Sequence, residues 1–323
     1  MKFSDFYGQS SMIGELRVSI SKSRVAHGFL LVGPQGIGKK TLARICAQAL
    51  LCTDRTENPQ KPCDECSACR RAMSNTHPDY IEIVTSTVQV GIDAIRELIA
   101  SLAERPFEGG NRAVLITKGI TPEAQNALLK TLEEPPEGTV FFITAANPQT
   151  LLPTVVSRLQ VIALSALDET TCAAALMSKG IDGEKARLLA RLSGGIVGKA
   201  LDMQGDSAYW RTRELAYEFL RPFTRGQIPE ITAKFAKGNI DGREFLSCVE
   251  SILSDVMRFH SGVNRVEIDK LSETERIAGY VGVREAVQIL DCVVESVYKL
   301  NSYVSLQAVI QSLAFKFAEV IKQ

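Results

Sequence analysis

A glycine-rich loop limits the fold of this chain more than any other part of its sequence. Residues 33–39 read GPQGIGK and lie between an apolar run at 29–32 and an amphipathic stretch at 39–51. A strand, such a loop and a helix in that order predict the phosphate loop of an α/β sheet, in which backbone N–H groups point at a phosphate. The nucleotide-binding candidates in the loop are Gly33, Gly36, Gly38 and Lys39. A loop kept only for the turn that it makes is the alternative.

Other short apolar runs predict the rest of a parallel sheet. Candidate strands lie at 80–84, 112–116, 140–144 and 160–164. A helix is predicted to start at Thr121, whose hydroxyl can cap it, and to end before Pro135. From Asp168 onward the strand patterns stop, and helical periodicity covers roughly 168–202 and 209–323. The predicted fold class is therefore an α/β module with a parallel sheet, followed by all-α parts.

The loop lacks the groups that normally hold Mg²⁺ beside a nucleotide. The position after the loop calls for a hydroxyl and carries Lys40, while Thr41, the nearest hydroxyl and so a further candidate, faces about 100° away on a helix. The strand at 112–116 runs into Thr117 and Lys118, where a metal-binding carboxylate is needed. We expect no ATP hydrolysis by this chain. The missing ligands favour loss of tight Mg·ATP binding over its retention.

Four of the eight cysteines predict a metal site. Cys52, Cys63, Cys66 and Cys69 have the spacing C-x10-C-x2-C-x2-C. A Cys-x2-Cys pair lets two thiolates bind one ion, and four thiolates suit a closed, tetrahedral, structural Zn²⁺ site without an open position for catalysis. Free thiols or a disulfide are the alternative, and a reducing compartment disfavours the disulfide.

Length and charge narrow the possible classes further. The chain has 323 residues, enough for two or three domains, and its acidic and basic side chains balance at 37 each. Zero net charge predicts no general attraction to nucleic acid, so a DNA contact would need a local patch. The N-terminal segment has no signal-peptide pattern, and no apolar run is long enough to span a membrane. These features together predict a cytoplasmic protein.

Three longer stretches resemble the delta-prime subunits of bacterial clamp loaders, which are part of DNA polymerase III and of the AAA+ superfamily. They lie at 26–31, 121–136 and 152–158, and the four cysteines fit the same family. The resemblance covers essentially the whole chain. It implies an AAA+ domain at 1–166 with an inserted zinc module at about 52–69, a small helical lid at 167–206 and a helical collar at 207–323.

The resemblance also implies roles for two cationic residues. Arg158 corresponds to the arginine that the family presents to a neighbouring subunit's ATP, which makes it the candidate arginine finger in trans. Lys199, in the stretch GIVGKA at 195–200, stands where the lid's nucleotide-sensing arginine is usual. Lysine keeps the charge there but loses the planar fork of arginine. An ordinary surface charge is the alternative at both positions.

The implied function is that of a clamp-loader subunit, which helps to load the sliding clamp of DNA polymerase III onto primed DNA. The implied partners are the motor subunits and the delta subunit in a five-membered ring, which in turn contacts the clamp and DNA. Two other functions stay open. One is an ATP-hydrolysing motor subunit of the same machine, and the other is a zinc-dependent DNA-binding module, which the zero net charge disfavours.

Overall fold

The computed structural model describes residues 2–21, 25–54, 62–108, 110–236, 240–262, 270–302 and 304–321. These residues form two compact units. The first unit comprises residues 1–180 and 194–199, and the second comprises residues 181–193 and 200–323. The predicted zinc module extends over residues 55–61, which lie outside the described residues.

A parallel five-stranded sheet forms the centre of the first unit. Its strands are β1 (Gly28–Val32), β2 (Tyr80–Glu82), β4 (Arg112–Ile116), β6 (Thr139–Ala145) and β7 (Gln160–Ala163), in the order β2-β4-β6-β1-β7. The predicted α/β class with a parallel sheet is therefore confirmed. Two short strands that the sequence did not suggest, β3 (Gln89–Val90) and β5 (Gly119–Ile120), pair beside it.

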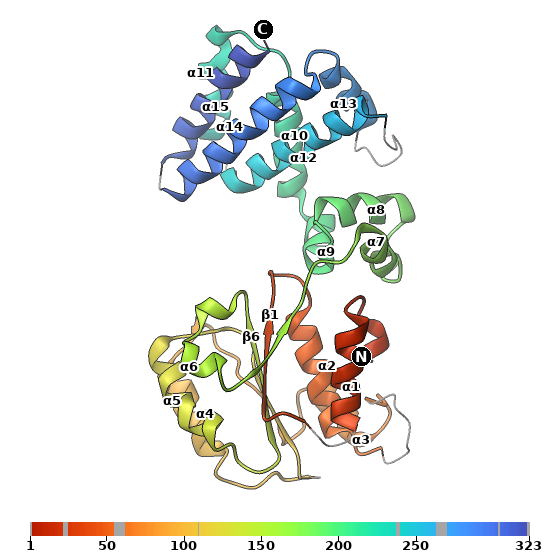
Figure 1. Cartoon of the computed structure of the whole chain (residues 1–323), viewed down its shortest axis with the longest axis vertical. Helices are drawn as coiled ribbons and strands as arrows, with labels where there is room; N and C mark the ends of the chain where they lie inside the picture. The colour runs from red at the N-terminus through yellow and green to blue at the C-terminus, as the bar shows by residue number, and fades with distance from the viewer. Residues whose placement is uncertain are drawn as a thin grey trace. The chain divides into compact units, whose positions relative to one another are not determined.

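Helices cover both faces of this sheet, as Figure 1 shows. On one face lie α1 (Ser10–Ser21), α2 (Lys39–Leu51) and α3 (Ser67–Met73), and on the other lie α4 (Ile92–Ser101), α5 (Pro122–Glu133) and α6 (Pro153–Val156). Strand β1 shows why its sequence is continuously apolar. Phe29 and Leu31 belong to the core under α2, while Leu30 belongs to the core under α5. A strand buried on both sides needs apolar residues at every position.

The predicted helix boundaries in this unit are observed. Helix α2 begins at Lys39 directly after Gly38, is 13 residues long and has Leu51 as its last residue. Helix α5 has Thr121 as its N-cap, whose hydroxyl accepts a hydrogen bond from the backbone N–H of Ala124 at 3.4 Å. Pro122 occupies the first turn, where its missing N–H costs nothing.

After β7 the regular structure of the described residues is helical. Across all described residues, short 3₁₀ turns lie at Phe3–Asp5, Pro148–Thr150 and Arg225–Gln227. The helices are α7 (Glu169–Met177), α8 (Gly183–Leu192), α9 (Val197–Gly205), α10 (Ser207–Phe219), α11 (Ile228–Ala236), α12 (Gly242–His260), α13 (Leu271–Ala278), α14 (Val283–Asn301) and α15 (Leu306–Val320). Among the described residues after Ala163 there is no strand, as the periodicity predicts. None of the described helices is long and apolar enough to cross a bilayer.

The division into two units passes through the segment predicted to be a lid. Helix α8 belongs to the second unit, where Arg191 forms a buried ion pair with Asp255 of α12. The turn at 194–199, whose last three residues are the first three of α9, belongs to the first unit, where the N–H of Leu167 donates to the carbonyl of Gly195 at 3.1 Å. The three-domain division with boundaries at 166 and 206 stays a prediction.

Candidate functional site

The phosphate loop has the backbone that its glycines predict. Gly33, Gly36 and Gly38 have φ angles of 149°, 80° and 101°, in the region that favours glycine. Lys39 does not extend away from the loop, because its Nζ donates to the carbonyls of Gly33 at 2.7 Å and Pro34 at 2.8 Å. Burial lowers the pKa of Lys39 below its ordinary value. The ammonium group thus binds the loop's own carbonyl oxygens.

The turn at 194–199 lies directly against this loop. The N–H of Gly198 donates to the carbonyl of Gly36 at 3.0 Å. The approach is so close that a Cβ on Gly36 would come within 2.8 Å of the backbone nitrogen of Lys199. The structure therefore brings Lys199 next to the loop through its backbone, while its side chain is exposed.

A buried carboxylate pairs with Lys40, the residue that directly follows the phosphate loop. Glu82, at the end of β2, has a side chain only 4% exposed and pairs with Lys40 Nζ at 2.9 Å and with Arg44 Nη2 at 3.0 Å. It also accepts a hydrogen bond from the Tyr80 hydroxyl at 3.0 Å and from Thr117 Oγ1 at 3.5 Å. Burial raises the pKa of Glu82, but the hydrogen bonds from Lys40, Arg44 and Tyr80 outweigh it and hold the pKa below its ordinary value.

Glu82 is a residue that the sequence interpretation missed. The interpretation looked for the acid after the strand at 112–116 and on the following helix, at Glu133 and Glu134, and β4 indeed ends at Ile116 and is followed by Thr117. In a parallel sheet the carboxyl ends of all strands meet at one edge, so the acid at the end of the neighbouring strand was a detectable candidate. The Glu82 carboxylate forms ion pairs with two cations of α2, Lys40 and Arg44. Lys40, which stands where a phosphate loop normally has its metal-binding hydroxyl, is therefore the partner of an acid.

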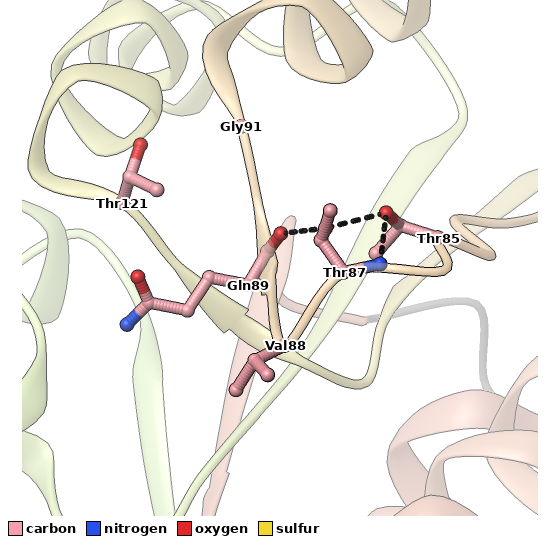
Figure 2. A pocket seen from close by; sticks show the side chains of 6 residues that line it. All are labelled: Thr85, Thr87, Val88, Gln89, Gly91 and Thr121. Atoms are coloured by element: carbon pink, nitrogen blue, oxygen red, sulfur yellow. Dashed lines mark hydrogen bonds between the residues drawn. The ribbon is translucent and has the colours of Figure 1, made fainter.

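The side chain of Lys118 contacts a segment that lines a cavity outside the phosphate loop. Its Nζ donates to the carbonyls of Thr85 and Thr87, the latter at 2.9 Å. Figure 2 shows the open cavity beside this segment, of about 630 Å³. It is lined by Thr85, Thr87, Val88, Gln89, Gly91 and Thr121. None of these residues belongs to the phosphate loop, and the hydroxyls of Thr85 and Thr87 bond to each other and to the local backbone.

Arg158 lies in the turn between α6 and β7. Its guanidinium donates to the carbonyl of Thr154 at 2.6 Å and forms an ion pair with Glu133 at the end of α5. The carbonyl of Arg158 is within 2.9 Å of His27 Nε2, which fixes the turn beside the start of β1. The side chain is 30% exposed, so it is held in place and also reachable from solvent.

The sheet separates Arg158 from the phosphate loop of the same chain. Gln160, two positions after the arginine, pairs with Phe29 at the beginning of β1, whereas Gly33 follows the end of β1. Gly33 follows His27 by six positions along extended chain, which at about 3.3 Å per residue is roughly 20 Å. An arginine side chain cannot cover that distance, and Arg158 cannot act on its own chain's loop.

The four cysteines converge as their spacing predicts. Their sulfur atoms all lie within 4.8 Å of one another, with separations of 3.6 Å for Cys52–Cys63 and 3.9 Å for Cys63–Cys69. Four thiolates around Zn²⁺ at about 2.3 Å lie about 3.8 Å apart, so the set fits this ion. The backbone N–H groups of Cys66 and Cys69 donate to the sulfurs of Cys63 and Cys66, each at 3.3 Å. These contacts favour thiolates and orient them inward.

Comparison with known proteins assigns the chain to a family. The family model for the DNA polymerase III delta subunit matches residues 8–168. The DNA polymerase III subunit delta' of Escherichia coli (strain K12) is 32% identical over 262 residues, which cover 78% of this chain and 76% of that protein. The chain belongs to the DNA polymerase III delta-prime family. The resemblance inferred from the sequence motifs is thereby confirmed.

The chain is also similar to proteins described as other subunits. The tau/gamma subunit of Haemophilus influenzae (strain ATCC 51907 / DSM 11121 / KW20 / Rd) is 35% identical over 170 residues, which are 52% of this chain but 24% of that protein. A gamma subunit-related protein of Thermotoga maritima, known from its crystal structure, aligns with 95% of this chain and 98% of its own at 15% identity and a TM-score of 0.48.

Proposed function

We propose that this chain is the clamp-loader subunit of DNA polymerase III that completes a neighbour's ATP site without hydrolysing ATP itself. The separation of Arg158 from its own phosphate loop carries the proposal. An exposed guanidinium on the far edge of the sheet acts on a nucleotide only if a second subunit brings one to it. In such a site it neutralises charge on the transferred phosphoryl group, an effect worth roughly 10³–10⁵ in rate.

The surroundings of the loop support the proposed absence of hydrolysis. Lys40 is paired with Glu82, and Lys39 binds loop carbonyls. A Mg²⁺ ion placed there would meet an ammonium group where it needs oxygen ligands. We expect nucleotide to bind weakly, in contact with Gly33, Gly36 and Gly38 of the loop, with Thr41 of α2 and with Lys199.

The proposed partners are those of a ring. Motor subunits of the tau and gamma type and a delta subunit would flank this chain, and the sliding clamp and primed DNA would be reached through the assembled ring in the cytoplasm. The second unit, which contains α10 to α15, is the proposed collar that holds the ring together.

The proposed cofactor is one structural Zn²⁺ ion. Cys52, Cys63, Cys66 and Cys69 would hold it, and the closed set of four sulfurs leaves no position for a substrate. The ion would stabilise the module next to α2 and α3, where Gln48 Nε2 also donates to Asp64 at 2.6 Å.

The test is the ATPase activity of the reconstituted ring with Arg158→Ala. We expect a normal amount of assembled ring and a loss of DNA-stimulated turnover of at least tenfold, with little rescue by Arg158→Lys because an ammonium lacks the planar fork. Arg96→Ala is the matched control. Arg96 is exposed on α4 and forms an ion pair with Asp93, which is also exposed, at 3.6 Å. Full turnover by an intact Arg158→Ala ring would refute the arginine-finger role.

An ATP-hydrolysing motor subunit is the competing function, because the tau/gamma relative is 35% identical over 170 residues of the chain. The purified chain alone separates the two functions. Steady turnover of ATP that is lost in Lys39→Ala would favour the motor, and no turnover above background favours the proposal made here.

A further inference from the structure

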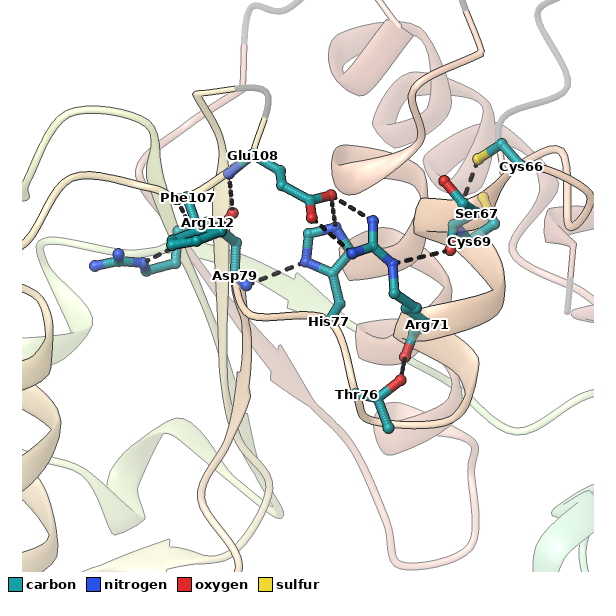
Figure 3. A network of polar contacts seen from close by, with 10 residues as sticks. All are labelled: Cys66, Ser67, Cys69, Arg71, Thr76, His77, Asp79, Phe107, Glu108 and Arg112. Atoms are coloured by element: carbon teal, nitrogen blue, oxygen red, sulfur yellow. Dashed lines mark hydrogen bonds and ion pairs between the residues drawn. The ribbon is translucent and has the colours of Figure 1, made fainter.

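Helix α3 connects the cysteine module to a segment of the sheet edge. Cys66 is the N-cap of this helix, Cys69 lies in its first turn, and Arg71 follows. In Figure 3 the Arg71 guanidinium faces the Glu108 carboxylate, with Nη1 donating to Oε1 at 2.6 Å and Nη2 donating to the second oxygen. The Nε of Arg71 donates to the carbonyl of Ser67 at 3.4 Å, which fixes the direction of the fork.

The segment that Glu108 belongs to is held by buried polar groups. The backbone N–H groups of Phe107 and Glu108 donate to the Asp79 carboxylate at 2.7 Å each. Asp79 is fully buried immediately before the edge strand β2, and Arg112 of β4 lies 3.7 Å from it. The stretch at 107–112 thus meets a distant part of the sequence around the Asp79 carboxylate (Figure 3).

A buried histidine completes the contact. The N–H of Asp79 donates to His77 Nδ1 at 3.1 Å, so the proton of the neutral ring is on Nε2, which lies 3.6 Å from the Glu108 carboxylate. Burial lowers the pKa of His77, which favours the neutral ring. Glu108 is therefore fixed by a cation of the cysteine module on one side and faced by a neutral ring on the other.

Apolar packing does not explain the order of this segment. The side chains at positions 103–108 are all exposed or only partly buried, and Phe107 is 83% exposed. An exposed aromatic ring gains nothing from water exclusion, so the segment depends on its hydrogen bonds and its ion pair. The Arg71–Glu108 pair is the contact that comes from the cysteine module.

We propose that the metal-loaded cysteine module acts through Arg71 as a brace, which holds the Pro106–Glu108 segment against the sheet edge and displays Phe107 in one position. The inference rests on the proposed metal centre. A seven-residue helix is too short to be stable alone, so α3 depends on its neighbours and on the ligands at its N-terminus. Removing the metal loosens α3, and Arg71 then no longer fixes Glu108.

Hydrogen–deuterium exchange of the full chain tests this brace. We expect the amides of Phe107 and Glu108 to exchange about tenfold faster after the metal is removed with a chelator, and by a similar factor in Arg71→Ala with the metal still bound. Arg70→Ala is the matched control, because Arg70 is on the same helix and donates to the carbonyl of Glu65 at 2.8 Å. It should leave these two amides at their native rates.

Metal content, measured by elemental analysis on every sample, keeps the two proposals distinguishable. A chain that contains no metal refutes the metal centre and with it the metal dependence of the brace. A chain that contains metal, but whose Phe107 and Glu108 amides keep their rates in Arg71→Ala or after chelation, overturns the brace alone. Glu108→Gln provides a second variant, which breaks the ion pair from the other side without touching the module and should speed exchange to the same extent.

Discussion

At the scale of single residues, the ion pairs of Glu82 give the first prediction. Glu82→Gln removes the charge that Lys40 and Arg44 face and leaves two cations next to each other. We expect a loss of about 1–3 kcal/mol in the free energy of unfolding at pH 7, the usual range for a hydrogen bond to a charged group. Urea unfolding of both proteins measures it. Glu97→Gln, an exposed position on α4, should change the stability by much less.

The same substitution predicts a pH dependence. The pKa of Glu82 is below its ordinary value of 4.5 in the folded chain, so its stabilisation is fully present above that value and is lost as the pH falls through the folded pKa. The stability difference between the native chain and Glu82→Gln should therefore be constant near neutral pH and shrink below about pH 4.5. A difference that grows in acid would contradict the assigned direction.

Residues differ in how far the sequence predicts them. The four cysteines were found because their spacing is local and chemically specific. Lys40 was identified as a defect, but its partner Glu82 was not, because the two side chains meet only when α2 packs on the face of the folded sheet. Arg158 and the loop lie at opposite ends of neighbouring strands, and this arrangement likewise depends on the parallel register of β1 and β7.

At the scale of elements, the close approach of two backbones gives the next prediction. A Cβ on Gly198 would lie 2.5 Å from the carbonyl oxygen of Gly36, a backbone atom that cannot move aside cheaply. We expect Gly198→Ala to displace the turn at 194–199 and to lower the free energy of unfolding by about 1–3 kcal/mol, as overpacking does. Gly183→Ala is the control, since a Cβ there meets nothing within 4 Å. Equal stabilities of the two variants would contradict the contact.

The cysteine module gives a second prediction for an element. Cys66→Ser removes one thiolate, and we expect less than one metal ion per chain together with faster proteolysis near α3, while the far-ultraviolet circular dichroism of the sheet unit stays close to native. Cys292→Ser, a half-buried cysteine of α14 outside the cluster, should keep the metal. A fully unfolded Cys66→Ser chain would show that the module supports the whole sheet.

The elements themselves were largely predictable for a physical reason. Strands β1, β4 and β6 are buried at every position, and apart from Arg112, Thr139 and Thr144 their sequences are free of polar side chains. Thr121 and Pro122 indicate the start of helix α5 in the sequence. The two-residue strands β3 and β5 have no apolar run of their own, and only the fold around them makes them pair.

At the scale of the whole molecule, the last prediction separates structure from catalysis in the assembled ring. Arg158 pairs with Glu133 in the isolated chain, and both side chains are partly exposed, at 30% and 49%. An exposed pair of this kind contributes less than about 1 kcal/mol, so Glu133→Gln should barely change the unfolding of the chain. In the ring, the Glu133→Gln substitution leaves the Arg158 guanidinium intact and free to turn toward a neighbour's phosphate. We therefore expect Glu133→Gln rings to keep full DNA-stimulated ATPase activity while Arg158→Ala rings lose it. Equal losses in both variants, with assembly checked by sizing, would mean that the ion pair and not the guanidinium is what the ring requires.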